Sequence, residues 1–271
     1  MSEQYDGYPS LLRARFAQAV LVGIGFFTSL DIYVVGLLIE PIKLDLKLTD
    51  VQVGFANATA FFSVYGLLST PMGMLADRFS RVRLLFLAMI LWIAGLSIVG
   101  ASHAVAFLVL GKGILGAANA VTYPAAMSLL SDYFSPDRRA MATSTYPVGQ
   151  TLGTAGATLI GGLGYSALVR MVTANPQALH GLAPWRTVTL AFAAVGVVLL
   201  PAILLMREPV RQEVSRRKAN GSIHELWSYR RVLIPTFAGI MFLSGAATGV
   251  SSWIAPALMR LYGQQPGQFA S

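Results

Sequence analysis

The chain has 271 residues, of which 55% are hydrophobic and only 12% are charged, whereas an ordinary soluble domain carries about 25% charged residues. This composition excludes a typical water-soluble globular protein. The formal net charge of +8 would suit a nucleic-acid partner, but the placement of the charges along the chain, described below, gives it another explanation.

Seven stretches are long and apolar enough to cross a membrane, which requires about 20 mostly apolar residues. They span residues 16–39, 51–76, 84–102, 104–131, 140–169, 187–206 and 232–259. Five contain no charged residue, and the first and fourth contain one each, Asp31 and Lys112. A soluble helical protein would show polar faces at the helical period. These stretches do not, so we expect an all-α polytopic membrane protein.

Lysine and arginine residues gather in alternate connections, and this asymmetry sets the orientation of a membrane protein. The N-terminal segment and the connections after the second, fourth and sixth stretches hold fourteen of them, and the opposite side holds five. We therefore expect a cytoplasmic N-terminus, in the inner (plasma) membrane of a bacterium. Contact with anionic lipids is a secondary interpretation of the basic side, and no nucleic-acid partner is expected.

The chemistry of a metal site or an enzyme is not visible in the sequence. There is no cysteine, and the three histidines, at 103, 180 and 224, lie apart at segment ends or in loops. No Ser/His or paired-Asp constellation and no glycine-rich phosphate loop occurs. We expect no metal, no cofactor and no enzymatic activity.

The stretches divide the chain into three parts. We expect a six-helix transmembrane bundle over 1–206, a basic cytoplasmic linker over 207–231 with a short amphipathic piece near 223–227, and over 232–271 the first helix of an incomplete second bundle. The exits of the first and seventh stretches, "EPIKLDLKLTDVQVGF" and "APALMRLYGQQPGQFA", are weakly similar. Such internal repeats are typical of secondary transporters, although chance similarity of two helix exits is the alternative.

The connection between the second and third stretches reads "GMLADRFSR" (73–81). It resembles the signature loop of the major facilitator superfamily, Gly-x-Leu-Ala-Asp-Arg-x-Gly-Arg-Lys. Ser80 and Val82 stand where that pattern has its second Gly and its Lys, and Arg83 is displaced by one position. "SDYFSPDRRAMA" (131–142), Trp185-Arg186 and Arg207-Glu208-Pro209 are also similar to family landmarks. The resemblance covers 16–271 and implies the six-helix N-terminal bundle of the major facilitator fold, followed by a seventh helix that starts a second repeat.

In this family the signature loop latches the two halves of the protein on the cytoplasmic side when the cavity opens outward. Gly73 and Ala76 are small enough to let neighbouring helices approach, and Asp77 can neutralise a helix N-terminus or an arginine of the other half. We expect the arginines to hold the loop in the cytoplasmic interface. The expected latch comprises Gly73, Asp77, Arg78, Arg81 and Arg83.

Two segments, "LLIEPIKLDLKLTDVQVG" and "AAMSLLSDYFSPDRRA", resemble the spinster-like branch, whose members include lysolipid and sphingoid-phosphate transporters. That branch usually carries Asp-Arg in helix 1, an Arg in helix 4 and a Glu seven residues later. This chain has Asp31-Ile32, Lys112 and Asn119 at those positions. Only the aspartate is kept, so the substrate and coupling of the branch do not carry over directly.

Asp31 and Lys112 are functional candidates because an ionisable group inside a bilayer costs several kcal/mol unless it faces a cavity or a partner. Each lies nine residues from the outer end of its stretch, marked by Glu40 and His103, or about 13 Å deep at about 1.5 Å per residue. The resemblance places both helices on the central cavity, so we expect a charge pair there. A permanently closed stabilising pair, or a Lys112 that snorkels outward, is the alternative.

Three further groups of residues could line a cavity. Lys112, Gly116, Asn119 and Tyr123 share one helix face; Asn57, Phe61 and Tyr65 share another; Tyr146 and Gln150 lie near Pro147, where a bent helix could line a cavity. Each group could instead be packing between helices. The expected substrate and proton-coupling residues are Asp31, Lys112, Asn119, Tyr123, Asn57, Tyr65, Tyr146 and Gln150.

These features together favour a secondary active transporter that works by alternating access. We expect it to move a small or amphipathic organic solute, anionic because of Lys112, and to couple transport to H⁺ through Asp31. Its partners would be the lipid bilayer, the solute and H⁺. The alternative is a truncated, non-transporting half that serves as a membrane partner or assembly subunit, since transport would need the missing C-terminal half or a second chain.

Overall fold

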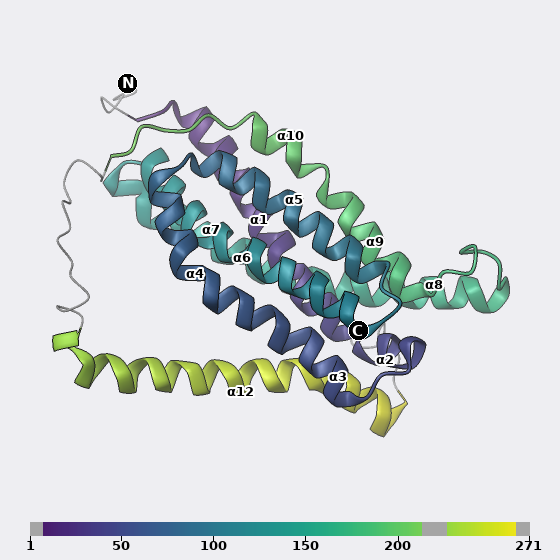
Figure 1. Ribbon diagram of the computed structural model, residues 1–271. Helices are drawn as coiled ribbons and strands as arrows, with labels where there is room; N and C mark the ends of the chain where they lie inside the picture. The colour runs from purple at the N-terminus through teal and green to yellow at the C-terminus, as the bar shows by residue number, and fades with distance from the viewer. Residues whose placement is uncertain (1–7, 213–226, 264–271) are drawn as a thin grey trace.

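The structure is a computed structural model that describes residues 8–212 and 227–263. Seven helical spans in this part of the chain are long and apolar enough to cross a membrane, which confirms the number predicted. Figure 1 shows the spans running side by side, apart from the last, which lies along one flank.

The first six spans form a bundle. Its elements are α1 (Leu11–Leu37), α2 (Ile39–Leu46), α3 (Asp50–Gly54), the π-helical turn η1 (Phe55–Thr59), α4 (Ala60–Arg78), α5 (Arg81–Gly100), α6 (Val105–Tyr133), α7 (Pro136–Gly156), the π-helical turn η2 (Ala157–Gly161), α8 (Gly162–Ala174), α9 (Pro184–Gly196) and α10 (Leu199–Leu204). The second span joins α3, η1 and α4, the fifth joins α7, η2 and α8, and the sixth joins α9 and α10. The two π-turns each place one extra residue within a span, and such turns often mark functional sites.

Glycines let the helices pair closely. A Cβ added at Gly149 or Gly153 of α7 would lie 2.4 and 2.1 Å from carbonyl oxygens of α1, and one at Gly116 of α6 would lie 2.4 Å from the carbonyl oxygen of Phe61 in α4. Only glycine permits such backbone contact, as is usual between membrane helices. α1 therefore packs on α7, and α4 on α6. Gly116 is a packing residue and does not line a cavity.

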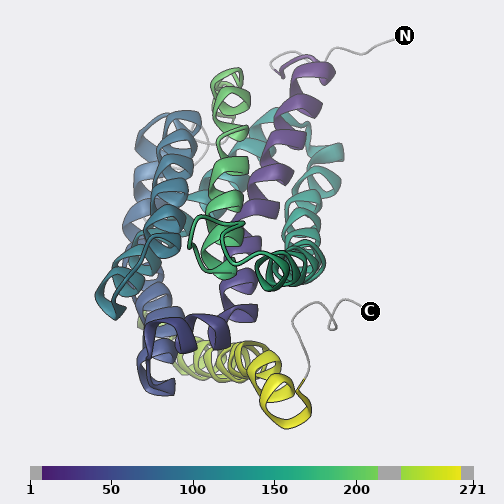
Figure 2. The ribbon, with the colours of Figure 1, turned by 90° about the vertical axis from the view of Figure 1, so that its right-hand side faces the viewer.

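The seventh span, α12 (Arg230–Tyr262), lies outside the bundle. It contacts α1 and α2, and Figure 2 shows it beside one end of the bundle helices. Trp253 of α12 packs there against Gly54, whose added Cβ would lie 3.3 Å from the indole ring.

The connection between the two parts is described over 207–212, where it lies against the ends of α4, α5 and α6. The expected amphipathic piece near 223–227, apart from Trp227, and three of the seven basic residues of the linker fall on 213–226, which lie outside the described residues. The three-part division of the chain over 1–206, 207–231 and 232–271 therefore stays a proposal.

Candidate functional site

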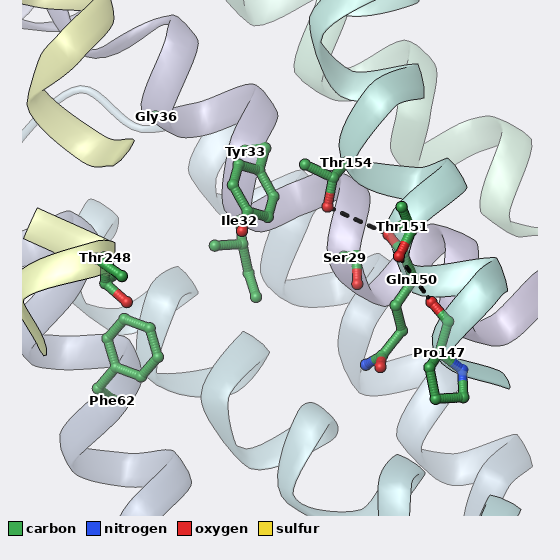
Figure 3. A pocket seen from close by; sticks show the side chains of 11 residues that line it. Ser29, Ile32, Tyr33, Gly36, Phe62, Pro147, Gln150, Thr151, Thr154 and Thr248 are labelled. Carbon is green, nitrogen blue, oxygen red and sulfur yellow. Dashed lines mark hydrogen bonds between the residues drawn. The ribbon is translucent and has the colours of Figure 1, made fainter. Parts of the chain in front are cut away.

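A cavity of about 440 Å³ lies between the bundle and α12 (Figure 3). Its walls come from α1, α4, α7 and α12. The lining residues are Ser29, Ile32, Tyr33, Gly36, Phe62, Pro147, Gln150, Thr151, Thr154, Ala247 and Thr248. On α1 they follow positions i, i+3, i+4 and i+7, which is one helix face.

The polar part of the lining consists of hydroxyl and amide groups, and none of the lining residues is charged. Thr151 and Thr154 donate their hydroxyl protons to the carbonyls of Pro147 and Gln150 in their own helix, at 3.0 and 3.2 Å. Each keeps lone pairs that can accept a hydrogen bond. The Gln150 amide bonds no residue within the described ranges and projects into the cavity (Figure 3). A polar, uncharged head group fits this wall.

Two apolar side chains lie on the opposite side of the lining, beside Tyr33 and Thr248. Ile32 and Phe62 face Gln150 across the cavity (Figure 3). A solute that fills the space would therefore place an apolar part against these two side chains and a polar part against α7.

Asp31 lies on α1 between lining residues but is turned away from the cavity. Its side chain is fully buried, and its Oδ1 accepts a hydrogen bond of 3.1 Å from Nε1 of Trp92 in α5. Its Oδ2 is buried and has no hydrogen-bond partner among the described residues. A lone unsatisfied carboxylate oxygen at this depth is costly, and this makes Asp31 the strongest candidate for a proton-binding group.

Lys112 is 2% exposed, which contradicts the alternative in which it snorkels outward. Its Nζ lies 5.9 Å from the centre of the Phe61 ring. No described carboxylate oxygen lies within 4 Å of it, so the expected charge pair with Asp31 is not a direct ion pair, although the two buried charges interact through space. The reason is geometric, since Asp31 turns toward α5 and Lys112 toward α4. Phe61 also stacks edge-to-face on Phe62, so this aromatic pair separates Lys112 from the cavity.

The other predicted residues do not line the cavity. Asn119 donates to the carbonyl of Leu115 in its own helix at 3.0 Å. Tyr65 stacks on Phe61, and Tyr123, 47% exposed, meets the buried ring of Tyr146 edge-to-face. Asn57 lies in η1, and its Oδ1 is buried without a hydrogen-bond partner among the described residues.

Of the eight predicted substrate residues, only Gln150 lines the cavity. The α1 face of the cavity was not predicted, and of the α7 face only Gln150 was, although both faces leave a periodic pattern in the sequence. Ser29, Ile32, Tyr33 and Gly36 repeat at helical spacing, and Thr151 and Thr154 surround Gln150 on the same face of α7. Those patterns were hidden because serine, threonine and glycine are common in membrane helices for packing alone.

The residues of the expected latch loop fall into two groups, one buried and one exposed. Arg81 was expected in the interface, but it is 1% exposed; it forms an ion pair with Asp132 and another with Glu208, whose Oε1 lies 2.7 Å from its Nε. Asp77, Arg78 and Arg83 are exposed. A Cβ at Gly73 would meet no described atom within 4 Å, so the expected close helix approach is not made there by described residues.

The linker supplies the remaining partners of this loop. Glu208 accepts hydrogen bonds from the Val82 amide at 2.9 Å, the Arg81 guanidinium and the Ser80 hydroxyl. Burial alone would raise the pKa of Glu208, but these bonds outweigh it and hold that pKa below its ordinary value. Arg211 donates to the last carbonyls of α4, including that of Ala76 at 2.9 Å, and so caps the helix end.

The end of α12 is attached to the bundle by charges that we call the α12 clasp. It comprises Arg260, Glu40, Asp50 and Lys43. The Arg260 guanidinium bonds Glu40 Oε2 at 2.7 and 2.9 Å and the two oxygens of Asp50 at 2.7 and 3.2 Å. Lys43 reaches Asp50 at 2.8 Å. The clasp thus attaches the C-terminal end of α12 to α2 and to the start of α3.

A family model described as Major Facilitator Superfamily matches residues 21–270. The chain belongs to the major facilitator superfamily. The resemblance predicted from the signature loop is thereby confirmed, and so is the all-helical membrane fold. With its seven spans, this superfamily member is an integral membrane protein.

Curated relatives of this superfamily member include an "MFS-type efflux pump" of Mycolicibacterium smegmatis, 28% identical over 94% of the chain and 57% of the relative. "Protein spinster homolog 1" of Homo sapiens is 28% identical over 75% of the chain and 36% of the relative. The chain thus spans little more than half, or less, of the length of these relatives.

Solved structures of a bacterial homolog of the human lysosomal transporter Spinster are also similar. The inward-facing, unoccupied form matches with a TM-score of 0.82 and 25% identity, over 97% of this chain and 59% of that one. The inward-facing, occupied form matches with a TM-score of 0.79 and 26% identity, over 97% and 57%. These matches confirm the resemblance to the spinster-like branch.

Proposed function

We propose that this protein is a secondary active transporter that moves a small amphipathic organic solute across the membrane by alternating access. The observation that carries the proposal is the cavity between the bundle and α12, with its hydroxyl and amide wall on α7 and its apolar wall at Ile32 and Phe62. Substrate sites between repeats near the bilayer midplane are the usual arrangement of secondary transporters. The names of the relatives, an efflux pump and spinster homologues, support transport.

We also propose that the arginine-rich end, with the N-terminus, faces the cytoplasm, in the inner membrane of a bacterium. The asymmetry of basic residues supports this orientation. With it, the exposed Asp77, Arg78 and Arg83 belong to an open cytoplasmic latch, and the α12 clasp belongs to a closed outer side. The resemblance to inward-facing structures supports the same state. The opposite wall of the path would come from a C-terminal half or a second chain.

For energy coupling we propose H⁺, bound at Asp31. The unpartnered Oδ2 becomes less costly when the carboxyl is protonated, because the neutral form does not need the solvation that this depth denies it. Asp31 shares a helix with Ser29 and Tyr33 of the cavity. We therefore expect water in the cavity to exchange a proton with Asp31 in one state of the transport cycle, and Asp31 to be closed off from that water in the other state.

Lys112 is the residue that bears on the charge of the solute. Lys112 favours an anionic head group, but Phe61 and Phe62 separate it from the cavity. An anion would bind only if this aromatic pair moves aside, whereas a neutral hydroxylated head group would bind the wall as it stands.

The experiment that tests these proposals uses the product of the native gene in proteoliposomes with an imposed pH gradient. Two fluorescent probes with the same acyl chain are compared, a nitrobenzoxadiazole-labelled lysophosphatidic acid and the corresponding monoacylglycerol. We expect Asp31→Asn to abolish gradient-driven accumulation but to leave exchange at equal pH. Gradient-driven accumulation that survives in Asp31→Asn would contradict the coupling role.

The cavity itself is tested by Gln150→Ala, with Gln177→Ala in an exposed loop as the matched control. Loss of one hydrogen bond of about 1 kcal/mol should raise the half-saturation concentration about fivefold for Gln150→Ala. Equal behaviour of the two variants would contradict the assignment of the cavity as the solute site. In the comparison of the two probes, stronger accumulation of the lysophosphatidic acid would identify an anionic head group, and stronger accumulation of the monoacylglycerol a neutral one.

A further inference from the structure

A second cavity, of about 370 Å³, lies at the arginine-rich end of the molecule, far along α1 from the first. It is bounded by the first turns of α1 and by the chain that follows α10. Its principal lining residues are Tyr8, Arg13, Phe16, Tyr133, Arg207 and Glu208. None of them belongs to the proposed solute site.

The cavity carries uncompensated positive charge. The side chains of Arg13 and Arg207 form no hydrogen bond or ion pair with any residue in 8–212 or 227–263. Glu208 also lines the cavity, but it is paired with Arg81, a guanidinium that it shares with Asp132, so the two arginines of the lining outweigh its single negative charge. Two free guanidinium groups converging on one space are the usual way to bind a phosphate.

The surroundings of the cavity are apolar on the membrane side. Leu12, Phe16 and Leu205 are 82%, 41% and 72% exposed, and Phe16 and Leu205 also line the cavity. Leu12 and Phe16 lie one helical turn apart on α1. All three lie at the ends of membrane-spanning helices, where side chains meet the boundary between head groups and acyl chains.

We propose that this cavity binds the phosphate head group of an anionic phospholipid, with Arg13 and Arg207 on the phosphate and an acyl chain against Phe16 and Leu205. A soluble phosphate would use the arginines but would gain nothing from the apolar side chains, so the observations favour the lipid. The site is independent of the transport proposal, because binding is measured without any solute.

The test is native mass spectrometry of the detergent-solubilised protein titrated with dioleoylphosphatidylglycerol. Dioleoylphosphatidylcholine is the head-group control, and sn-glycerol 1-phosphate and inorganic phosphate are the soluble controls. We expect one retained phosphatidylglycerol per chain and an affinity about fivefold weaker for each of Arg13→Gln and Arg207→Gln. Arg15→Gln is the matched control, since Arg15 is exposed on the same helix but does not line the cavity.

Equal losses for Arg13→Gln and Arg15→Gln would mean a diffuse attraction to the basic surface and would overturn the site. Binding of phosphatidylcholine or of the soluble phosphates as tight as that of phosphatidylglycerol would overturn the lipid assignment. Should an arginine variant not fold, Val210→Glu provides a second test. Val210 lines the cavity and is 76% exposed, so a carboxylate there should repel the phosphate without disturbing the core. Unchanged binding in that variant would likewise refute the proposal.

Discussion

The buried Arg81 cluster gives the largest effect that the structure predicts for a single substitution. Arg81→Ala removes the partner of Asp132, a carboxylate whose side chain is only 5% exposed. Leaving a buried charge unpaired in this way costs about 3–5 kcal/mol. For a chain of this size each kcal/mol lowers Tm by about 2–4 °C, so we expect Tm to fall by roughly 6–20 °C. Thermal unfolding in detergent, followed by tryptophan fluorescence, measures the change.

The matched control is Arg83→Ala, two residues further along. Arg83 is an exposed arginine of the same loop, and its loss should change the free energy of unfolding by about 0.5 kcal/mol or less. A double variant, Arg81→Met with Asp132→Leu, should recover part of the stability, because it removes the most deeply buried pair, while Glu208, 29% exposed, loses Arg81 but keeps its bonds from Ser80 and Val82. The reasoning fails if Arg81→Ala and Arg83→Ala lower Tm equally, or if the double variant loses the sum of the two single effects.

Three further predictions follow from contacts elsewhere in the molecule. Gly153→Ala places a Cβ 2.1 Å from a carbonyl oxygen of α1, so it should separate α1 from α7 and lower Tm by several degrees. Gly164→Ala is the control: its Cβ meets no described atom within 4 Å, and Tm should stay unchanged. Arg260→Ala breaks the α12 clasp, and because the clasp is partly exposed, Tm should change little. A cysteine introduced at Ala255, which is 8% exposed, should however react faster with a soluble maleimide in the Arg260→Ala variant than with Arg260 in place. An unchanged labelling rate would rule out the clasp as a closure. The folded pKa of Glu208 lies below its ordinary value, so its stabilisation is complete above that value and is lost as pH falls through the folded pKa. The Tm difference between wild type and Glu208→Gln should therefore be constant above about pH 5 and shrink below it; a difference that grows on acidification would show the opposite sign of shift.

The fold could be predicted because hydrophobic length and loop charge are properties of whole segments. Seven spans and the superfamily follow from stretches of about 20 apolar residues and from one loop with Gly73, Asp77 and Arg81 at their spacing. Such signals do not depend on how far each helix is rotated about its axis.

The site could be predicted only in part, because rotation decides which residues meet. Asp31 and Ser29 are two positions apart on α1, yet one turns to Trp92 and the other to the cavity. Arg81 is buried by Glu208, a residue 127 positions away along the chain, and no local sequence pattern predicts that contact. The π-turn at 55–59 changes the rotation of the second span between its ends, which periodicity alone cannot foresee.

The close backbone contacts at Gly149 and Gly153 also decide which part of the molecule can move. Two helices whose backbones touch cannot slide or separate without losing contacts along their whole length, so α1 and α7 form one stiff unit, and Gly116 ties α6 to α4 in the same way. Three walls of the solute cavity thus belong to inflexible pairs. The fourth wall, α12, is attached at its end by the ion pairs of the α12 clasp, in which water can replace each partner. Any change in the width of the cavity should therefore be a displacement of α12 or of one helix pair against the other, and distances measured by paired spin labels should stay constant within each pair.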